Sequence, residues 1–286
     1  MDLLVTVDRN YLHPLAVMLK SFACSNEGSH TVYILNRKLT QEDVDALSSV
    51  LCEPRLKLIY YPIREPAVSE APTSGRYPIE IYDRIFAAHY LPETLDRVLY
   101  LDPDLVVLHS LDDLWNLDMG EYWFAAASHV KKIGEVFNAV RLEAETIGPY
   151  INSGVMLMNL DLLRRYQKTG PVLVYVKEHE HSLMLPDQDI ISALYGEHIL
   201  SIDPYIYNMT DRMLNAQQML PDSPVTAEWV EQNSRIVHYL GRSKPWKKNY
   251  QGRLGYLYRR YEAMLEQGSA QYSEQTSWEK QEVILI

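Results

Sequence analysis

The stretch from Val98 to Leu108 constrains this chain more than any other, because it sets two carboxylates between two apolar runs. A short apolar run that ends at a turn signal is typical of a buried strand, so Val98–Leu101 is predicted to be one. Asp102 and Asp104 follow two residues apart and therefore point to the same side of an extended backbone. Pro103 between them cannot donate a ladder hydrogen bond, so strand pairing should stop there.

The two aspartates favour a metal site at the end of that strand. Like charges at such a separation repel, and each carboxyl group resists ionisation unless a positive charge lies between them. A divalent cation is the simplest such charge. The alternative is an acidic turn between two strands, and Asp102 and Asp104 by themselves are compatible with both interpretations.

Length and composition indicate an ordinary globular protein. The 286 residues suffice for one large α/β domain or two small ones, and 47% hydrophobic with 23% charged residues argues against disorder. The formal net charge of −11 argues against binding nucleic acid as a main role.

The chain carries no signal for secretion or for a membrane span. The two cysteines, Cys24 and Cys52, are too few for a disulfide scaffold and do not have metal-site spacing. The N-terminus lacks a charged region followed by a long apolar one, and no stretch approaches 18 apolar residues. We therefore expect the protein in the cytoplasm.

Strand-like and helical segments alternate through the first half of the chain. The expected strands there are Leu3–Val7, Val32–Leu35, Leu56–Tyr61 and Val98–Leu101, with a further apolar run at Leu105–Leu108. The expected helices are Tyr11–Ala23, Gln41–Val50 after a Thr40 cap, and Ile79–Leu91 after Tyr77-Pro78. Such alternation predicts a mostly parallel sheet with helices on both faces and ligands at the carboxyl ends of its strands, where Asp8 and Asp102 fall.

The second half is less regular. Its expected strands are Phe124–Ser128, Gly154–Met158 and Arg235–Leu240, and its expected helices are Pro171–His179, Gln188–Tyr195 and a basic, aromatic one from about Tyr250 to Leu265. A polar tail starts near Gln267. No linker divides the chain, so we expect a single catalytic domain over residues 1–249 and a C-terminal helix and tail over 250–286.

Six segments, taken together and in this order, resemble glycosyltransferase family 8. They are Val5–Tyr11, Tyr82–Ile85, Tyr100–Asp104, Tyr150–Gly154, Leu185–Ile190, and His238–Gly241 with Lys244–Trp246. The resemblance spans about Leu3 to Trp246. It implies a GT-A fold, a Rossmann-like α/β nucleotide-diphospho-sugar transferase fold with a mixed, mostly parallel sheet flanked by helices. It also implies a UDP-sugar donor and Mn²⁺ or Mg²⁺ as cofactor.

The resemblance implies that Asp102, Asp104 and His238 ligate the metal. Carboxylates plus an imidazole, with positions left open for diphosphate oxygens, suit Mn²⁺ better than Ca²⁺ and lack the thiolates of a structural zinc site. The alternative for His238 is an ordinary core or surface histidine. Pro103 stands where the family more usually has a small or branched residue, which should stiffen the site.

The resemblance assigns the nucleotide to two further segments. Tyr11 would stack on the uracil ring, Asp8 would accept from the base N–H, and Asn10 would reach the ribose or base. Their alternative is a strand-to-helix turn, which favours Asp and Asn. Arg84 and Lys244 would contact the diphosphate, and Gly241 would let the backbone approach it. The alternatives are a surface arginine and a solvated lysine.

Asp187, Gln188 and Asn152 resemble the family's donor-sugar site. Asp187 would hold sugar hydroxyls, and Gln188 would face the anomeric carbon opposite the leaving group. A glutamine amide is a poor covalent nucleophile, so front-face attack through an ion-pair-like transition state is favoured, unlike the two-carboxylate scheme of glycoside hydrolases. The alternative for Asp187 is the N-cap of the helix that follows Pro186.

The function expected from the resemblance is a retaining, metal-dependent transfer of glucose or galactose from a UDP-sugar to a saccharide or glycolipid acceptor. The alternatives are a metal-dependent nucleotide-sugar hydrolase or nucleotidyl-transfer enzyme, and a non-catalytic nucleotide-sugar sensor. The basic, aromatic C-terminal helix suits peripheral contact with an anionic membrane at its inner face, or packing of its aromatic side on the domain.

Overall fold

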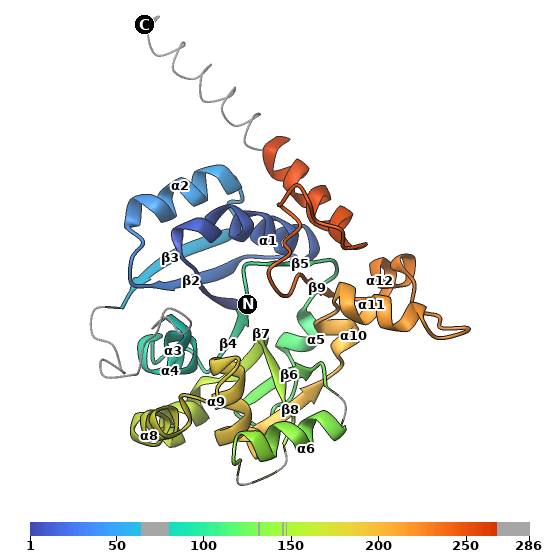
Figure 1. The fold of residues 1–286 in the computed structure, drawn as a ribbon. Helices are drawn as coiled ribbons and strands as arrows, with labels where there is room; N and C mark the ends of the chain where they lie inside the picture. Colours follow the sequence, from blue (N-terminus) through green and yellow to red (C-terminus); the bar gives the residue numbers. More distant parts are fainter. Residues whose placement is uncertain (64–79, 131, 145, 147, 268–286) are drawn as a thin grey trace, which may run out of the picture.

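The computed structural model describes residues 1–63, 80–130, 132–144, 146 and 148–267 (Figure 1). A seven-stranded sheet has the order β3-β2-β1-β4-β7-β6-β8, and a two-stranded sheet pairs β5 with β9. The strands are β1 (Asp2–Thr6), β2 (His30–Asn36), β3 (Leu56–Pro62), β4 (Arg97–Leu101), β5 (Leu105–Val107), β6 (Phe124–Ser128), β7 (Ile151–Asn159), β8 (Ile199–Ile202) and β9 (Ile236–His238).

Helices connect most of these strands. In the first half they are η1 (Arg9–Tyr11), α1 (Leu12–Ser25), α2 (Gln41–Leu51), α3 (Glu80–Ile85), α4 (Ala87–Tyr90), α5 (Asp112–Trp115) and α6 (Lys132–Arg141). In the second half they are α7 (Leu160–Tyr166), α8 (Thr169–His179), α9 (Pro186–Tyr195), η2 (Gly196–His198), α10 (Pro204–Tyr207), α11 (Asp211–Gln218) and α12 (Ala227–Asn233). Residues 255–267 form one more helix, at the red end of the ribbon in Figure 1.

The sheet is mixed and mostly parallel, as predicted. Strands β3, β2, β1 and β4 run parallel to one another, β7 is antiparallel to both β4 and β6, and β8 is parallel to β6. The carboxyl ends of β1 and β4 therefore meet at one edge, which brings the segments after Thr6 and Leu101 close together.

Side chains alternate between the two faces of the sheet and therefore belong to two separate hydrophobic cores. Leu3 and Leu99 belong to the cluster that includes residues of α1, α2 and the C-terminal helix. Leu4 and Tyr100 belong to the cluster that includes residues of α3, α4, α7, α8 and α9. This period of two carries past the end of β4, so that Asp102 falls on the same side as Tyr100.

Two elements near the site begin or end differently from the sequence prediction. The helix expected over Ile79–Leu91 is interrupted at Phe86, whose dihedral angles of φ −98° and ψ 21° are not helical. The Phe86 N–H still donates to the Tyr82 carbonyl at 3.1 Å. Its expected start at Tyr77–Ile79 lies outside the described residues. Strand β7 starts at Ile151 rather than Gly154, because the Ile151 N–H donates to the Ser192 hydroxyl and the strand pairs back to Ser128.

The C-terminal helix packs its apolar side into the core. Leu254, Leu257, Tyr258, Tyr261 and Leu265 are all buried in the cluster shared with α1, which is the packing alternative considered for this segment. The helix begins at residue 255 rather than 250, after a turn in which Asp211 accepts from the Tyr250 hydroxyl and the Leu254 N–H. The tail beyond Gln267 lies outside the described residues.

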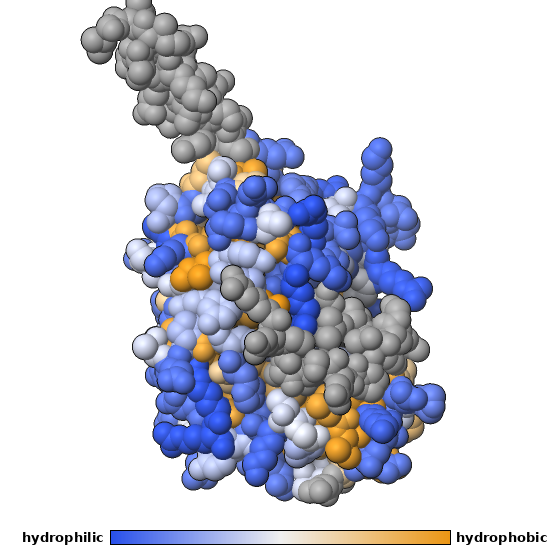
Figure 2. Space-filling model, turned by 90° about the vertical axis from the view of Figure 1, so that its left-hand side faces the viewer, coloured by the Kyte–Doolittle hydropathy of each residue, from blue (hydrophilic) through white to orange (hydrophobic). Residues whose placement is uncertain are grey.

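The surface turned to the viewer in Figure 2 is mostly hydrophilic, with separate apolar patches. None of the helices in the described part of the chain has the length and apolar character needed to cross a membrane.

Candidate active site

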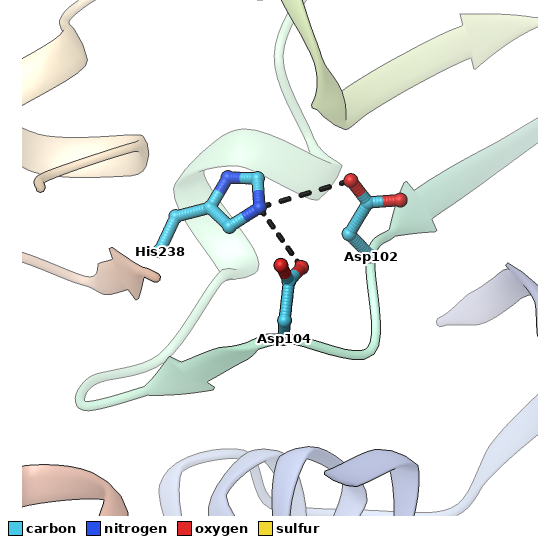
Figure 3. Close-up of side chains that lie close together, drawn as sticks. All are labelled: Asp102, Asp104 and His238. Atoms are coloured by element: carbon cyan, nitrogen blue, oxygen red, sulfur yellow. Dashed lines mark hydrogen bonds and ion pairs between the residues drawn. The ribbon is translucent and has the colours of Figure 1, made fainter. Parts of the chain in front are cut away.

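Two short strands bring the acid pair and the histidine together. Asp102 follows β4 and donates its N–H to Gly154 O on β7 at 2.8 Å, and Asp104 precedes β5. Strand β5 pairs antiparallel with β9 so that Leu105 lies opposite His238. The His238 Nε2 atom lies 3.1 Å from Asp104 Oδ1 and 3.7 Å from Asp102 Oδ2 (Figure 3).

This cluster fits a divalent cation. One ligand atom from each of Asp102, Asp104 and His238 lies within 4.8 Å of the others. Gly154 keeps the space open, since a Cβ on it would lie 2.2 Å from His238 Cε1 and 2.6 Å from Asp102 Oδ2. Two carboxylates and one imidazole form a donor set suited to Mn²⁺ or Mg²⁺, with further positions left for ligand oxygens.

Lys244 lies in the same cluster and is not a solvated lysine. Its ammonium is 8% exposed, donates to Asp104 Oδ2 and donates to the Tyr239 carbonyl at 2.8 Å. Burial disfavours the Asp104 carboxylate, but His238 and Lys244 outweigh it and hold the pKa of that carboxyl well below its usual range. Gly241, just before this lysine, has a φ of +85°, which glycine adopts without strain.

Arg84 joins the acid pair to the predicted sugar site. Its Nη1 atom donates to Asp102 Oδ1 at 3.2 Å and to Asp187 Oδ2 at 3.0 Å, and its side chain is only 15% exposed. Burial lowers the pKa of Arg84, but Tyr100 and the two carboxylates raise it above its ordinary value. Among the described residues, the buried Arg84 Nε atom has no hydrogen-bond partner. The surface alternative for this residue is therefore wrong.

Tyr100 holds the same Asp102 oxygen as Arg84 does. Its hydroxyl donates to Asp102 Oδ1 at 2.7 Å and lies 3.1 Å from the Thr6 hydroxyl. Burial raises the pKa of Tyr100 well above its usual value, and Asp102 adds to the shift. The phenol therefore stays a neutral donor.

Asp187 is not the N-cap of α9. The N-cap is Leu185, with Pro186 in the first turn, and Asp189 accepts from the N–H groups of Met184 and Leu185 at 2.6 and 3.0 Å. Asp187 instead accepts from the Ser153 hydroxyl at 2.5 Å as well as from Arg84. The capping alternative is wrong, and Asp187 turns toward the metal cluster.

Gln188 and Asn152 are bonded to each other beside Asp187. Asn152 Nδ2 donates to Gln188 Oε1 at 2.6 Å, and the Ser153 N–H donates to the same oxygen at 3.3 Å. Gln188 is 7% exposed. On the other side, Asn152 Oδ1 accepts from Asn208 Nδ2 at 2.9 Å.

The segment predicted to bind the nucleoside lies at the carboxyl end of β1. Asp8 caps η1 by accepting from the Asn10 N–H at 2.8 Å, so the turn role considered for it is present. Tyr11 packs edge-on against Trp246, with ring centroids 5.8 Å apart. Burial raises the pKa of Tyr11, and the charge of Asp104 adds to it, which is a sign of proximity to the acid pair. Asp8 and Asn10 are exposed.

The structure thus joins most of the predicted site residues in one network. Asp102, Asp104, His238, Lys244, Arg84, Asp187, Asn152 and Gln188 are linked by the contacts given above. Sequence reasoning missed Asn208, which links His238 to Asn152, and gave no role to Tyr100 or Ser153. Nothing around Asn208 in the sequence marks it, because its partners are 30 and 56 residues away along the chain.

Known proteins resemble this chain both in sequence and in structure. The chain is 28% identical over 244 residues to a lipopolysaccharide 1,2-glucosyltransferase of Escherichia coli, which covers 84% of this chain and 71% of the relative. It is 24% identical to a lipopolysaccharide 1,3-galactosyltransferase of Salmonella typhimurium over 84% of this chain and 71% of the relative. The crystal structure of the galactosyltransferase LgtC, solved with donor and acceptor sugar analogues, superposes with a TM-score of 0.76 at 22% identity. That match covers 92% of this chain and 96% of LgtC and shows the GT-A fold. The model of glycosyl transferase family 8 matches residues 2–250, and the chain belongs to this family.

Proposed function

We propose that this glycosyltransferase is a retaining, metal-dependent hexosyltransferase that moves glucose or galactose from a UDP-sugar to a saccharide or glycolipid acceptor. The observation that carries the proposal is the cluster of Asp102, Asp104 and His238 at the carboxyl end of β4, in which Asp104 and His238 are buried. We place the activity in one cytoplasmic catalytic domain, residues 1–249, with the C-terminal helix packed on it.

The choice of sugar rests on the relatives. Those with a named reaction transfer glucose or galactose to lipopolysaccharide, according to their names. A hexose donor is therefore the first to test. A metal bound at the cluster would stabilise the negative charge of a departing nucleoside diphosphate as a Lewis acid, without proton transfer.

The chain's own charges suit the same leaving group. Lys244 is held beside Asp104 by two hydrogen bonds, so a cation is already positioned where a diphosphate would bind. Arg84 lies between Asp102 and Asp187 and neutralises part of their charge, which favours a donor whose diphosphate and sugar lie on either side of it. Tyr11 offers a half-buried ring for the base at the end of β1.

The proposal of retention rests on the sugar site. Asp187 is committed to Arg84 and Ser153, which suits a carboxylate that holds sugar hydroxyls and not a covalent nucleophile. Gln188 is an amide, and its carbonyl oxygen already accepts two hydrogen bonds. Attack of the acceptor from the side of the leaving group is the route that needs no covalent intermediate.

Two assays test the function. The enzyme is incubated with UDP-glucose or UDP-galactose and Mn²⁺, with and without a panel of saccharide acceptors, and transfer, free hexose and UDP are measured. We expect acceptor-dependent UDP release and, by NMR, a product that keeps the α configuration of the donor. Hydrolysis that no acceptor alters would favour the hydrolase alternative, and donor binding without turnover would favour the sensor. An inverted product would refute retention.

A further inference from the structure

A single buried asparagine lies between the metal cluster and the sugar site. Asn208 is completely buried, and its two side-chain atoms have different partners. Its Oδ1 lies 3.0 Å from His238 Nδ1, and its Nδ2 lies 2.9 Å from Asn152 Oδ1. Asn152 in turn contacts Gln188, so Asn208 is the link between a metal ligand and the residue that faces the sugar.

The backbone decides which way each amide in this chain must point. The Gly154 N–H can only donate, and it donates to Asn152 Oδ1 at 3.2 Å. That oxygen is therefore an acceptor, and the Asn208 atom facing it must be the NH₂ group. The Asn208 oxygen is then left facing His238, and an amide oxygen can only accept.

The hydrogen bond at Nδ1 decides which ring atom is left for a metal. An acceptor at Nδ1 requires the ring to carry a proton there, so Nε2 is the ring atom available to bind a metal. Nε2 is the atom that points to Asp104 and Asp102, at 3.1 and 3.7 Å. Asn208 therefore holds the ring with Nε2 toward the metal cluster, and the Nδ1 proton stays in place when Nε2 ligates a metal.

The hydrogen bonds of Asn152 fix the orientation of the Gln188 amide. Because Asn152 Oδ1 accepts from Gly154 and Asn208, its Nδ2 must donate, and Gln188 Oε1 receives it at 2.6 Å. The Ser153 N–H donates to the same Gln188 oxygen. Rotation of the Asn208 amide would therefore disturb both the hydrogen bond from His238 Nδ1 and the hydrogen bonds of Asn152.

The backbone holds Asn208 in place independently of its side chain. Its own N–H donates to the Pro204 carbonyl at 3.1 Å, and its carbonyl accepts from His129 Nε2 at 2.7 Å. The next residue, Met209, bridges to Val237 and accepts from the His238 N–H at 2.8 Å. Side-chain substitutions at Asn208 leave all of these bonds available.

We propose that Asn208 is a positioning residue, which holds the Nδ1–H of His238 so that Nε2 faces the metal cluster and, through Asn152, sets the orientation of Gln188. The inference rests on the proposed metal-dependent transfer for its role in catalysis, but the hydrogen bond from His238 Nδ1 to Asn208 is a property of the metal-free protein. The two can therefore fail separately.

The first measurement observes the Nδ1 proton directly. The ¹H and ¹⁵N signals of the His238 ring in the metal-free protein should show a proton on Nδ1 that exchanges slowly with water in the wild type and faster in Asn208→Leu. Asn152→Ala does not touch His238 but frees the Asn208 amide to rotate, so it should also speed the exchange. A wild-type ring without a proton on Nδ1, or no change in either variant, overturns the proposal.

The second measurement is Mn²⁺ affinity, determined by electron paramagnetic resonance without donor. Loss of an outer partner of a metal-bound histidine typically lowers affinity about 10–100-fold, and we expect this for Asn208→Leu. Asn208→Asp keeps an acceptor for Nδ1 but cannot donate to Asn152, so it should still bind Mn²⁺ while kcat for transfer falls. Asn215→Leu, an exposed asparagine in α11, is the matched control and should change neither.

The outcomes separate the two proposals. If Asn208→Leu binds Mn²⁺ as the wild type does, the positioning role is wrong. If the wild type itself binds no Mn²⁺, the proposed function fails, and the ring signals still test the hydrogen bond from His238 Nδ1 to Asn208. Should Asn208→Leu fail to fold, as judged by circular dichroism, Asn152→Ala and Asn208→Asp carry the test.

Discussion

Gly154 on β7 is packed directly against the imidazole of His238, although 84 residues separate them in the sequence: a Cβ on Gly154 would lie 2.2 Å from His238 Cε1. The same Cβ would lie 2.6 Å from Asp102 Oδ2. Strand β7 thus needs a glycine at the position where two predicted metal ligands converge on it.

Gly154→Ala should therefore impair the metal cluster. Overpacking of a buried site typically costs about 1–3 kcal/mol, and here the strain falls on His238 and Asp102. We expect reduced Mn²⁺ affinity and reduced transfer, measured by calorimetry and by turnover. Gly170→Ala is the matched control, because a Cβ on Gly170 meets nothing within 4 Å. Equal Mn²⁺ affinity in Gly154→Ala and the wild type would show that the cluster does not bind the metal.

Removal of any one proposed ligand should abolish transfer. Asp102→Ala, Asp104→Ala and His238→Ala each delete a donor atom from the cluster, and the effect should exceed the roughly 10–100-fold that loss of an outer partner costs. Circular dichroism should show that each variant folds. Asp104→Asn complements Asp104→Ala, because it keeps an oxygen near the buried Lys244. Near-normal turnover at saturating Mn²⁺ would exclude that residue from the metal site, and chelation of the wild type should reproduce the loss reversibly.

Tyr11→Ala should weaken UDP binding. Loss of a base-stacking aromatic ring typically costs about 1–3 kcal/mol, by analogy with nucleic-acid-binding sites. Tyr11→Phe keeps the ring and should bind UDP nearly as the wild type does. Tyr11 also packs on Trp246, so the free energy of unfolding is measured alongside. Unchanged UDP affinity in a folded Tyr11→Ala protein would refute the stacking role.

Stability should fall at alkaline pH because of a buried tyrosine in α9. Burial raises the pKa of Tyr195 to about 12. An unfolded tyrosine has a pKa of about 10, so between these values unfolding releases a proton and becomes easier as pH rises. The free energy of unfolding should drop by about 1 kcal/mol by pH 11 relative to Tyr195→Phe. Denaturant titrations from pH 8 to pH 11 test this, with Tyr122→Phe, at an exposed position, as control. Parallel curves for wild type and Tyr195→Phe would contradict it.

Any contact of the C-terminal helix with a membrane should depend on its exposed basic side, because its apolar side is buried. Arg259 in the helix and Lys248 shortly before it are both exposed. If the predicted peripheral contact exists, the protein sediments with anionic vesicles at low salt and is released at high salt. Lys248→Gln/Arg259→Gln should weaken sedimentation, whereas Lys57→Gln/Lys177→Gln, with the same charge change at other exposed positions, should not. No sedimentation of the wild type at low salt would end the membrane hypothesis.

The sequence by itself determined the layered α/β architecture and the position of the acid pair. Apolar runs such as Val98–Leu101 and the periodic segment over Gln41–Val50 specify their own local structure, and β4 and α2 form within one residue of those bounds. The end of a buried strand is also a local property. The sequence alone therefore predicts that Asp102 and Asp104 lie together at the end of a strand.

Tertiary structure decided what surrounds that pair. The edge strand β8 has only four residues, with one of them buried, and exists through its pairing with β6. The interruption at Phe86 and the start of β7 at Ile151 depend on neighbours far along the chain. Whether Arg84 is a surface residue or a bridge between Asp102 and Asp187 also depends on folding, since 103 residues separate Arg84 from Asp187.

Asn208 is the clearest example of a residue whose contacts cannot be predicted from the sequence. Its bonds to His238 and Asn152 exist only because α10 and the Met209–Val237 bridge deliver its side chain between two strands. An asparagine's hydrogen-bonding capacity is the same everywhere in a sequence, whereas burial with one acceptor and one donor on opposite sides is set by the three-dimensional arrangement. Sequence motifs therefore identify the residues proposed to bear the chemistry, whereas the residue proposed to orient them is identified only by the three-dimensional structure.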